Sequence, residues 1–214
     1  MPTATDLICN FGDVFELDYP TWDVLRIIEQ LKQNPNWCRY NPRKPHINRW
    51  GLSVTSIDGS VGCGPDLDSL REYNLENPTA PLHEFSFTTL TEVGREIPES
   101  ANVVNSFPTG TVGRSHFLRL DAGGFFPPHR DNGIAVPGSS MRIVVPLVDF
   151  DSKGAHVWLL DGLPLHLKAG RTYFVNTSKV HSVFSFADGC YLMVYNVRTT
   201  AQAITYCASR ALIK

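Results

Sequence analysis

Two histidines and one aspartate are the residues of this chain whose types and spacing best suit metal chemistry. His129 and Asp131 stand two positions apart, and His181 follows 52 residues after His129. On an extended strand, side chains at positions i and i+2 point to the same face, so the first two can act together. Two imidazoles with one carboxylate form the ligand set of a mononuclear non-haem iron(II) site, which leaves coordination positions open for chemistry.

Ordinary explanations compete with a metal site. A His-x-Asp pair also occurs where a histidine hydrogen-bonds an aspartate in a turn. His156 and His166 are rival third ligands, but both are expected in an apolar hairpin, where a histidine is more often structural. The context favours the metal site, because a Gly-Gly-x-x-Pro-Pro run precedes His129 and because His181 begins a late strand.

The second half of the chain predicts the β-structure that would hold these side chains. From about residue 111, short apolar runs alternate with turns that contain Gly, Pro or Asp, which is typical of antiparallel strands. Asp161-Gly162, between two apolar runs, is a strong signal for a two-residue hairpin. We predict a mainly β fold, a double-stranded β-helix or cupin-like jelly roll. The expected strands are 114–120, 141–148, 155–160, 163–168, 171–176, 181–186 and 190–198.

The 214 residues are expected to form a single domain. Residues 1–110 would supply buttressing N-terminal helices and extra strands that cover one sheet. Residues 111–200 would form the jelly-roll core, and residues 201–214 a C-terminal segment. No stretch of the chain has the composition of a linker between separate domains.

Helices are expected only in the first half of the chain. The clearest one is predicted at 21–34, where Thr21 can cap its start and an Asn-Pro pair ends the pattern. A weaker helix is expected to begin at Asp66. Residues 88–105 stay ambiguous, because Pro98 interrupts their helical pattern.

Composition argues against several classes of protein. The net charge of −2 gives no general attraction to nucleic acid or anionic membranes, and no apolar run approaches the roughly 18 residues of a membrane span. The five cysteines are scattered without a C-x-x-C pair, so we predict free thiols in a reducing compartment. No basic-then-apolar leader is visible at the N-terminus, and a cytoplasmic location is therefore expected.

Several segments between about 111 and 198 together match the pattern of a known enzyme family. They are Arg119-Leu-Asp-Ala-Gly-Gly, Pro128-His129-Arg130-Asp131-Asn132, Met141-Arg142-Ile-Val-Val-Pro146-Leu, Leu167-Lys-Ala-Gly170-Arg-Thr-Tyr-Phe174-Val-Asn176 and His181-Ser-Val-Phe. This stretch resembles the 2-oxoglutarate- and iron(II)-dependent oxygenases, and most of all their aspartyl/asparaginyl β-hydroxylase branch. The resemblance implies an enzyme in which His129, Asp131 and His181 bind Fe(II). It also implies that Arg142, thirteen residues after His129, helps to bind the cosubstrate 2-oxoglutarate.

The chain departs from that branch at one position. The branch usually carries a second arginine ten residues after the distal histidine, where it holds the far carboxylate of 2-oxoglutarate, and here that position is Tyr191. A carboxylate in a partly dry pocket needs a positive partner, preferably a bidentate guanidinium. We expect Arg119 to replace the missing arginine and Tyr191 to add a hydrogen bond. Arg198 is a weaker candidate because its strand parity is opposite to that of Tyr191.

The resemblance implies hydroxylation of an unactivated C–H bond in a small-molecule or peptide substrate, namely an amino acid that is free or within a peptide. Three alternatives stay open: a non-enzymatic cupin-like module that binds a metal or ligand, a cofactor-independent dioxygenase or isomerase, and a nucleobase-acting oxygenase. Residues 39–50 gather four Lys or Arg residues with aromatics. This segment is either a solvated connection or an arm over the barrel mouth that binds an anionic or planar substrate. Residues 132–140 are expected to form a loop at the pocket edge.

Overall fold

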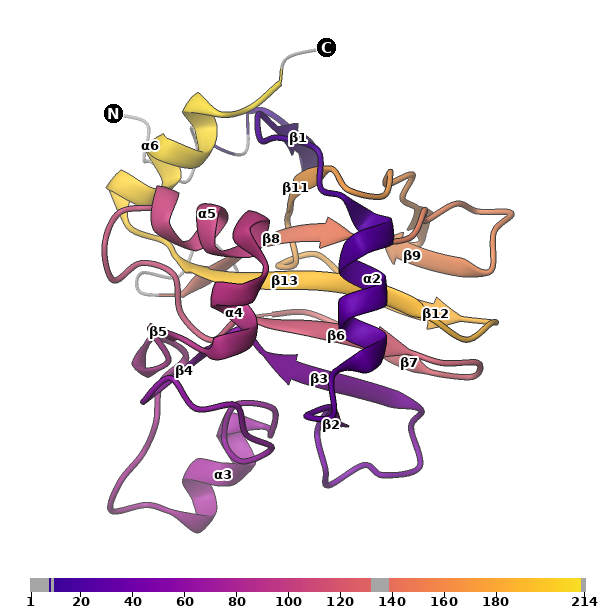
Figure 1. Ribbon diagram of the computed structural model, residues 1–214. Coiled ribbons are helices and arrows are strands. Elements are labelled where there is room, and N and C mark those ends of the chain that lie inside the picture. The colour runs from indigo at the N-terminus through magenta and orange to yellow at the C-terminus, as the bar shows by residue number, and fades with distance from the viewer. Residues whose placement is uncertain (1–7, 9, 132–138, 213–214) are drawn as a thin grey trace.

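The computed structural model describes residues 8, 10–131 and 139–212, and two antiparallel sheets form its centre (Figure 1). A short two-stranded sheet of β4 (Thr55–Ser56) and β5 (Thr89–Leu90) lies beside them. The small sheet contains, in order, β10 (Leu163–Pro164), β9 (His156–Leu160), β12 (His181–Ser185) and β7 (Phe125–His129). The large sheet contains, in order, β1 (Val14–Leu17), β11 (Thr172–Val175), β8 (Ser140–Pro146), β13 (Cys190–Arg198), β6 (His116–Leu120), β3 (Arg49–Ser53) and β2 (Cys38–Arg39).

The strand order is that of a jelly roll. Of the eight strands from β6 to β13, four neighbours (β11, β8, β13, β6) belong to the large sheet and four (β10, β9, β12, β7) to the small one. The paired strands of the described part of the chain all run antiparallel. Consecutive strands thus alternate between two facing sheets, except for the β9–β10 hairpin within the small sheet, as in the cupin-type double-sheet architecture. The predicted mainly β, double-stranded β-helix fold is confirmed.

Most predicted strands agree with the observed ones to within two residues at each end. The strand expected at 163–168 is shorter, since β10 ends at Pro164. The strand β7 was not predicted, because Pro127 and Pro128 argue against a central strand. The structure places it at the edge of the small sheet, with a shift in register against β12 at the two prolines, and edges and bulges are where a strand tolerates proline. The hairpin between β9 and β10 turns at Asp161 and Gly162, both with positive φ, as predicted.

The helix predicted at 21–34 is α2 (Val24–Gln33), which begins later than predicted. Its N-cap is Asp23, whose carboxylate accepts a hydrogen bond from the Arg26 backbone N–H at 3.2 Å. The sequence favoured Thr21 as the cap. The helix ends at the Asn-Pro pair, as expected, and buries Ile27 and Leu31.

The ambiguous region forms two short helices, α4 (Glu92–Glu96) and α5 (Pro98–Ser106). Pro98 begins the second helix instead of ending a pattern, because the first helical position needs no N–H donor. The weaker helix predicted from Asp66 is α3 (Leu70–Glu76), capped by Ser69 and followed by the 3₁₀ turn η1 (Glu84–Ser86). The C-terminal segment contains a helix that the sequence did not predict, α6 (Ala201–Ser209).

Strand alternation gives the large sheet two different faces. The helix face packs against α2, α4, α5 and α6, and Figure 1 shows α2, α4 and α5 in front of this sheet. The cavity face looks toward the small sheet and forms a second core. Its side chains include Leu118, Leu120, Val144, Val175 and Leu192. The helix face carries Phe117, Met141, Ile143, Val145, Phe174, Met193 and Tyr195.

The expectation of free thiols is wrong for one pair of cysteines. Cys38 and Cys63 form a disulfide, with their Cα atoms 5.4 Å apart. Spacing alone could not predict it, because 25 residues separate the two and β2 brings them together. Cys190 and Cys207 are free, and burial raises the pKa of each thiol to about 12. The helices of the described residues include none long and apolar enough to cross a membrane.

Candidate metal centre

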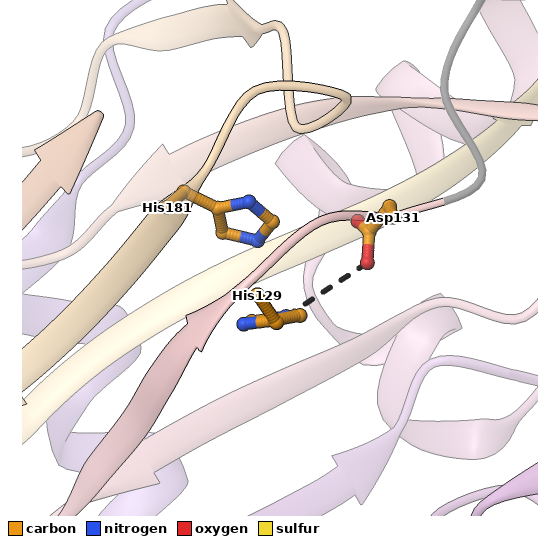
Figure 2. Close-up of side chains that lie close together, drawn as sticks. All are labelled: His129, Asp131 and His181. Carbon is orange, nitrogen blue, oxygen red and sulfur yellow. Dashed lines mark ion pairs between the residues drawn. The ribbon is translucent and has the colours of Figure 1, made fainter. Parts of the chain in front are cut away.

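Two neighbouring strands of the small sheet bring His129, Asp131 and His181 together at the mouth of the jelly roll (Figure 2). His129 is the last residue of β7, and His181 is the first residue of β12. The two are direct cross-strand partners. Asp131 follows β7 and is positioned by its backbone N–H, which donates to the carbonyl of Thr177 at 2.9 Å. The register of one antiparallel pair therefore unites residues that stand 52 positions apart in the chain.

The three side chains lie close enough to hold one ion. One potential ligand atom of each lies within 4.8 Å of the others, and His129 Nε2 is 3.8 Å from Asp131 Oδ1. The two imidazole ring centroids are 4.2 Å apart. Metal–ligand bonds of about 2.1 Å place neighbouring ligands about 3 Å apart, so modest side-chain rotations close the set around an ion.

Backbone carbonyls orient both imidazoles. His129 Nδ1 is 2.7 Å from the carbonyl oxygen of Pro127, and His181 Nδ1 is 3.1 Å from that of Lys179. Each carbonyl accepts a hydrogen bond only if the Nδ1 atom carries the proton, which leaves the Nε2 lone pair free. A hydrogen bond to the ring nitrogen that does not bind the metal fixes the tautomer and the ring orientation of metal-binding histidines. Burial also lowers the pKa of His181, which keeps its imidazole neutral.

Asp131 divides its carboxylate between two partners. Its Oδ1 faces His129, whereas its Oδ2 lies 3.1 Å from Nε of Arg142, a residue of β8. Burial alone would raise the pKa of Asp131, but the nearby Arg142 and His181 outweigh burial and hold that pKa below its usual value. The ionised carboxylate can therefore bind a cation through Oδ1 while Arg142 holds Oδ2.

This donor set fits a divalent transition metal. Two imidazole nitrogens and one carboxylate oxygen, all on one side of a cavity, are the 2-His-1-carboxylate arrangement of non-haem iron(II) proteins. Within residues 8, 10–131 and 139–212, no other group of three or more His, Cys, Asp or Glu side chains has comparable spacing. The structure thus brings together the three residues predicted from the sequence, and their binding of a metal stays a prediction.

A cavity of about 100 Å³ leads from the three side chains into the jelly roll. Its apolar wall comes from both sheets, and its polar end comes from the large sheet. Tyr40, from the basic segment 39–50, also lines it and packs against the His116 ring. The apolar residues are Leu118, Phe126, Val144, Trp158, Val183, Leu192 and Val194. The polar ones are Arg114, His116, Arg142, Thr177 and Asn196.

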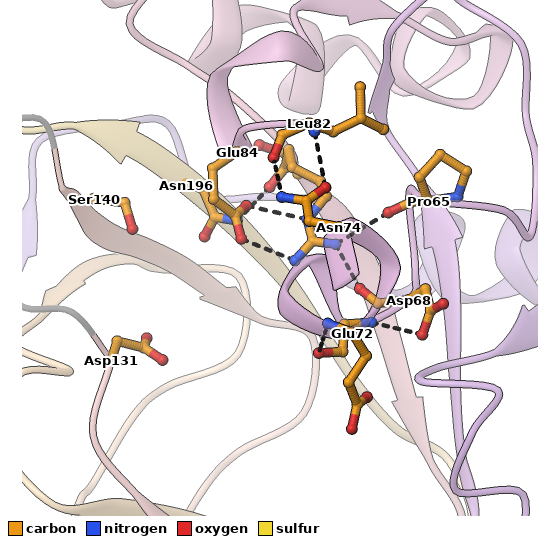
Figure 3. A network of polar contacts seen from close by, with 12 residues as sticks. Pro65, Asp68, Glu72, Asn74, Leu82, Glu84, Asp131, Ser140 and Asn196 are labelled. Atoms are coloured by element: carbon orange, nitrogen blue, oxygen red, sulfur yellow. Dashed lines mark hydrogen bonds and ion pairs between the residues drawn. The ribbon is translucent and has the colours of Figure 1, made fainter. Parts of the chain in front are cut away.

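The polar end is built around Arg114, whose donors are largely committed. Figure 3 labels its partners Pro65, Asp68 and Glu84. The Arg114 guanidinium makes two hydrogen bonds to Glu84 and two to backbone carbonyls of residues 65 and 68. Asn196 donates to Glu84 and to the Arg114 carbonyl, and its Oδ1 is buried without a partner among the described residues. The same holds for His116 Nδ1, and burial lowers the pKa of His116 far below its usual value. These two atoms are available to a bound molecule.

The predicted second carboxylate clamp is wrong in its placement. Arg119 and Tyr191 are cross-strand partners, but both side chains lie on the helix face of the large sheet and neither lines the cavity. Arg119 forms an ion pair with Asp121 at 3.3 Å and lies over the rings of Trp37 and Trp50. Arg142, by contrast, has the parity of Val144 and lines the cavity, as predicted.

The remaining sequence candidates lie away from the centre. His156 hydrogen-bonds Ser185 at 2.9 Å, and His166 is exposed beside Asp151. Arg198 is exposed and lies over the Phe85 ring. Of the predicted pocket-edge loop 132–140, residues 132–138 lie outside the described part of the chain.

Sequence reasoning missed the roles of Arg114, Tyr40, Thr177 and Asn196 as residues of the cavity wall. Asn196 is the cross-strand partner of Arg142, so knowledge of the strand register would have placed it there. Thr177 follows β11, and it was expected only as part of a loop before His181. No local pattern distinguishes the other two residues from ordinary strand or loop residues.

No family profile and no curated protein sequence matches the chain. Similar solved structures include a conserved Streptococcus pyogenes protein of unknown function, with 17% identity over 41% of this chain and 64% of that one and a TM-score of 0.30. Salicylate 1,2-dioxygenase from Pseudoaminobacter salicylatoxidans in complex with gentisate has 16% identity over 42% of this chain and 21% of its own, with a TM-score of 0.30. DMSP lyase DddQ from Ruegeria pomeroyi has 17% identity over 41% of this chain and 38% of its own, with a TM-score of 0.31.

The matched segments thus span less than two thirds of each of these three proteins. Likenesses at this level of identity and TM-score assign neither a family nor an activity to this chain.

Proposed function

We propose that the protein is an Fe(II)- and 2-oxoglutarate-dependent oxygenase that hydroxylates an unactivated C–H bond of an amino acid or a peptidyl residue. One observation carries the proposal. His129, Asp131 and His181 converge on one edge of a cavity, with both Nδ1 atoms held by carbonyls and with Arg142 beside the carboxylate. When bound, iron(II) would supply the redox chemistry that activates dioxygen and oxidises 2-oxoglutarate to succinate and carbon dioxide.

The chain's own residues would bind, orient and shield the reactants. His129, Asp131 and His181 would hold the ion, and the cavity beside them would take the cosubstrate. Arg142 would hold a carboxylate of 2-oxoglutarate by a charge-assisted hydrogen bond. Trp158 and the aliphatic residues of the wall exclude water, which strengthens these electrostatic interactions.

A second candidate is a metal-dependent enzyme of this fold that needs no cosubstrate, such as a dioxygenase or isomerase. It is favoured by the helix-face position of Arg119, which leaves the cavity without the second free arginine expected for a dicarboxylate. Arg114 lines the cavity but is already bound to Glu84. His116 and Asn196 could still meet the far end of 2-oxoglutarate, and an experiment must separate the two candidates.

The proposal is tested by anaerobic addition of iron(II) and then 2-oxoglutarate to the purified protein. A visible metal-to-ligand charge-transfer band is expected when the cosubstrate chelates iron. His181→Ala should abolish the band because the ion is lost. Arg142→Met, studied at saturating iron, should raise the 2-oxoglutarate concentration for half-maximal band intensity at least about tenfold, as expected for a lost hydrogen bond between charged groups.

Arg119→Met is the matched control, since it removes a guanidinium from the other face of the same sheet. It should leave the 2-oxoglutarate titration unchanged. Arg142→Lys keeps the charge beside Asp131 and should give an intermediate value, which separates loss of the clamp from disturbance of the carboxylate. Stoichiometric iron binding with no band at millimolar 2-oxoglutarate would overturn the proposal in favour of the second candidate.

A further inference from the structure

Beside the metal centre lies a second hollow of about 310 Å³, which none of the roles described above uses. It is formed by the basic segment 39–50, by β3 and by the end of β7. Tyr40, Arg114, Phe126 and His129 line both this hollow and the metal cavity, so the two adjoin along those side chains. Lys44 and Arg49 line only the second hollow.

Arg49 is buried without a counter-ion. Its side chain enters from β3 on the cavity face, opposite Leu120, and the residue is only 4% exposed. Among the residues that the structure describes, no carboxylate forms an ion pair with it. Within the described part of the chain, its guanidinium makes one hydrogen bond, from Nη1 to the Phe125 carbonyl at 3.3 Å, and its Nε is buried without an acceptor. Burial lowers the pKa of this guanidinium.

The protein around Arg49 compensates this buried charge only in part. The guanidinium lies 4.6 Å from the Phe126 ring centroid and 5.3 Å from that of Tyr40. Such cation–π contacts contribute roughly 0.5 to 2 kcal/mol, whereas removing a charged group from water costs several kcal/mol per ion. A buried charge of this kind is ordinarily paired, so the missing anion points to a ligand.

The other charges at the hollow leave it positive. Lys44 is exposed and has no ion pair among the described residues. Asp68 also lines the hollow, where Arg43 holds it through Nε and Nη2 at 2.8 to 3.0 Å; Arg43 pairs with Glu72 and Glu76 as well, and neither of these lines the hollow. Arg114 is likewise balanced by Glu84. Two unpaired cations thus face one space, one buried and one at the rim.

We infer that this hollow binds the carboxylate of an organic anion through Arg49 and Lys44. A planar guanidinium matches a carboxylate in geometry, and the aromatic and proline walls suit an apolar body attached to it. Inorganic phosphate is the other anion that a guanidinium recognises, but it would leave these apolar walls unused. Because His129 borders the hollow, the anchored molecule lies next to the metal centre. The identification of this anion as the substrate rests on the proposed function, whereas its binding does not.

The test is calorimetric titration of the full-length protein with phenylacetate, with its uncharged isostere phenylacetamide, and with inorganic phosphate. Phenylacetate should bind at least about tenfold more tightly than the amide and than phosphate, since a charge-assisted hydrogen bond contributes about 1.5 kcal/mol or more. Arg49→Met should remove this preference. Lys44→Ala changes an exposed side chain and should weaken phenylacetate binding severalfold in a fully folded protein.

Two further variants distinguish failure of the inference from failure of Arg49→Met to fold and from failure of the proposed function. Arg49→Lys keeps the positive charge if Arg49→Met does not fold, and it should retain part of the preference. His181→Ala removes a metal ligand that does not line the hollow, so carboxylate binding should persist even where iron binding is lost. Equal affinity for phenylacetate and phenylacetamide, or unchanged binding in both Arg49→Lys and Lys44→Ala, would overturn the inference. Tighter binding of phosphate than of phenylacetate would overturn the assignment to a carboxylate.

Discussion

Arg142 and Arg119 occupy opposite faces of the same large sheet and illustrate how differently those faces are used. Arg142 lies on the cavity face, where it meets Asp131 beside the metal-binding side chains. Arg119 lies on the helix face, where two tryptophan rings and Asp121 hold it in place. On the cavity face, polar groups therefore lie where a ligand can reach them. On the helix face, polar groups are taken up by packing contacts.

The largest expected effect comes from removing the carboxylate of Asp131, compared with removing the carboxylate of Asp121. Asp131→Ala removes one of three ligands and should abolish stoichiometric iron binding at micromolar iron(II), measured by anaerobic equilibrium dialysis. Asp121→Ala removes the carboxylate that pairs with Arg119 and should leave iron binding intact. Loss of iron binding in both variants would contradict the claim that only the carboxylate beside the cavity matters for iron binding.

The helix face should govern stability and leave metal binding unaffected. Phe117 is fully buried among the helices, so Phe117→Ala should lower the free energy of unfolding by about 3 to 5 kcal/mol through lost burial and a residual cavity. The affinity of the folded variant for iron should not change. Denaturant titration measures the first and dialysis the second, and exposed Phe186 provides a control substitution with an effect within about 0.5 kcal/mol.

The buried carboxyl group of Asp66 should carry a stability cost that depends on pH. Burial raises the pKa of Asp66 to about 6, above its usual 3.8, despite a hydrogen bond with Ser53. The folded state therefore binds this proton more tightly, and stability falls as the pH rises from about 4 to 6. Asp66→Asn should gain about 1 to 3 kcal/mol at pH 7 and nothing below pH 4. A gain that does not vary between pH 4 and 7 would contradict this origin.

The smallest effect is expected from a polar group within the helix-face core. Tyr195 is fully buried, and its hydroxyl lies 3.1 Å from Ser100 Oγ of α5. Tyr195→Phe should cost about 1 kcal/mol of unfolding free energy, the usual net value of one hydrogen bond. Ser100→Ala in the same background should add little, because the partner is already lost. A double-mutant cycle in urea measures the coupling.

Part of the molecule was predictable because local patterns determine it. Apolar alternation located most of the jelly-roll strands, and Asp161-Gly162 fixed one hairpin through its need for positive φ. The hidden strand β7 shows the limit of such patterns, since Pro127 and Pro128 are tolerated only at a sheet edge. Which strand lies at an edge is a property of the whole sheet and of no single segment.

The prediction for Arg119 and Tyr191 shows the same limit in the site. Residues 119 and 191 were expected to share a face, and as cross-strand partners they do. The sequence could not say which face looks into the cavity, because both faces of this sheet are buried and both parities are apolar. Arg49 was visible only as one charge in a basic segment, and its burial without a counter-ion emerged from the packing of β3 against β7.

The sequence by itself determined the types of metal-binding side chains, their spacing and the alternation that builds antiparallel strands, because these depend on residue chemistry and on neighbours along the chain. The tertiary structure alone decided that His181 pairs with His129, that Arg119 faces the helices and that Arg49 lacks a counter-ion. Each of these depends on strand register and on contacts between distant segments, which only close packing of the whole chain fixes.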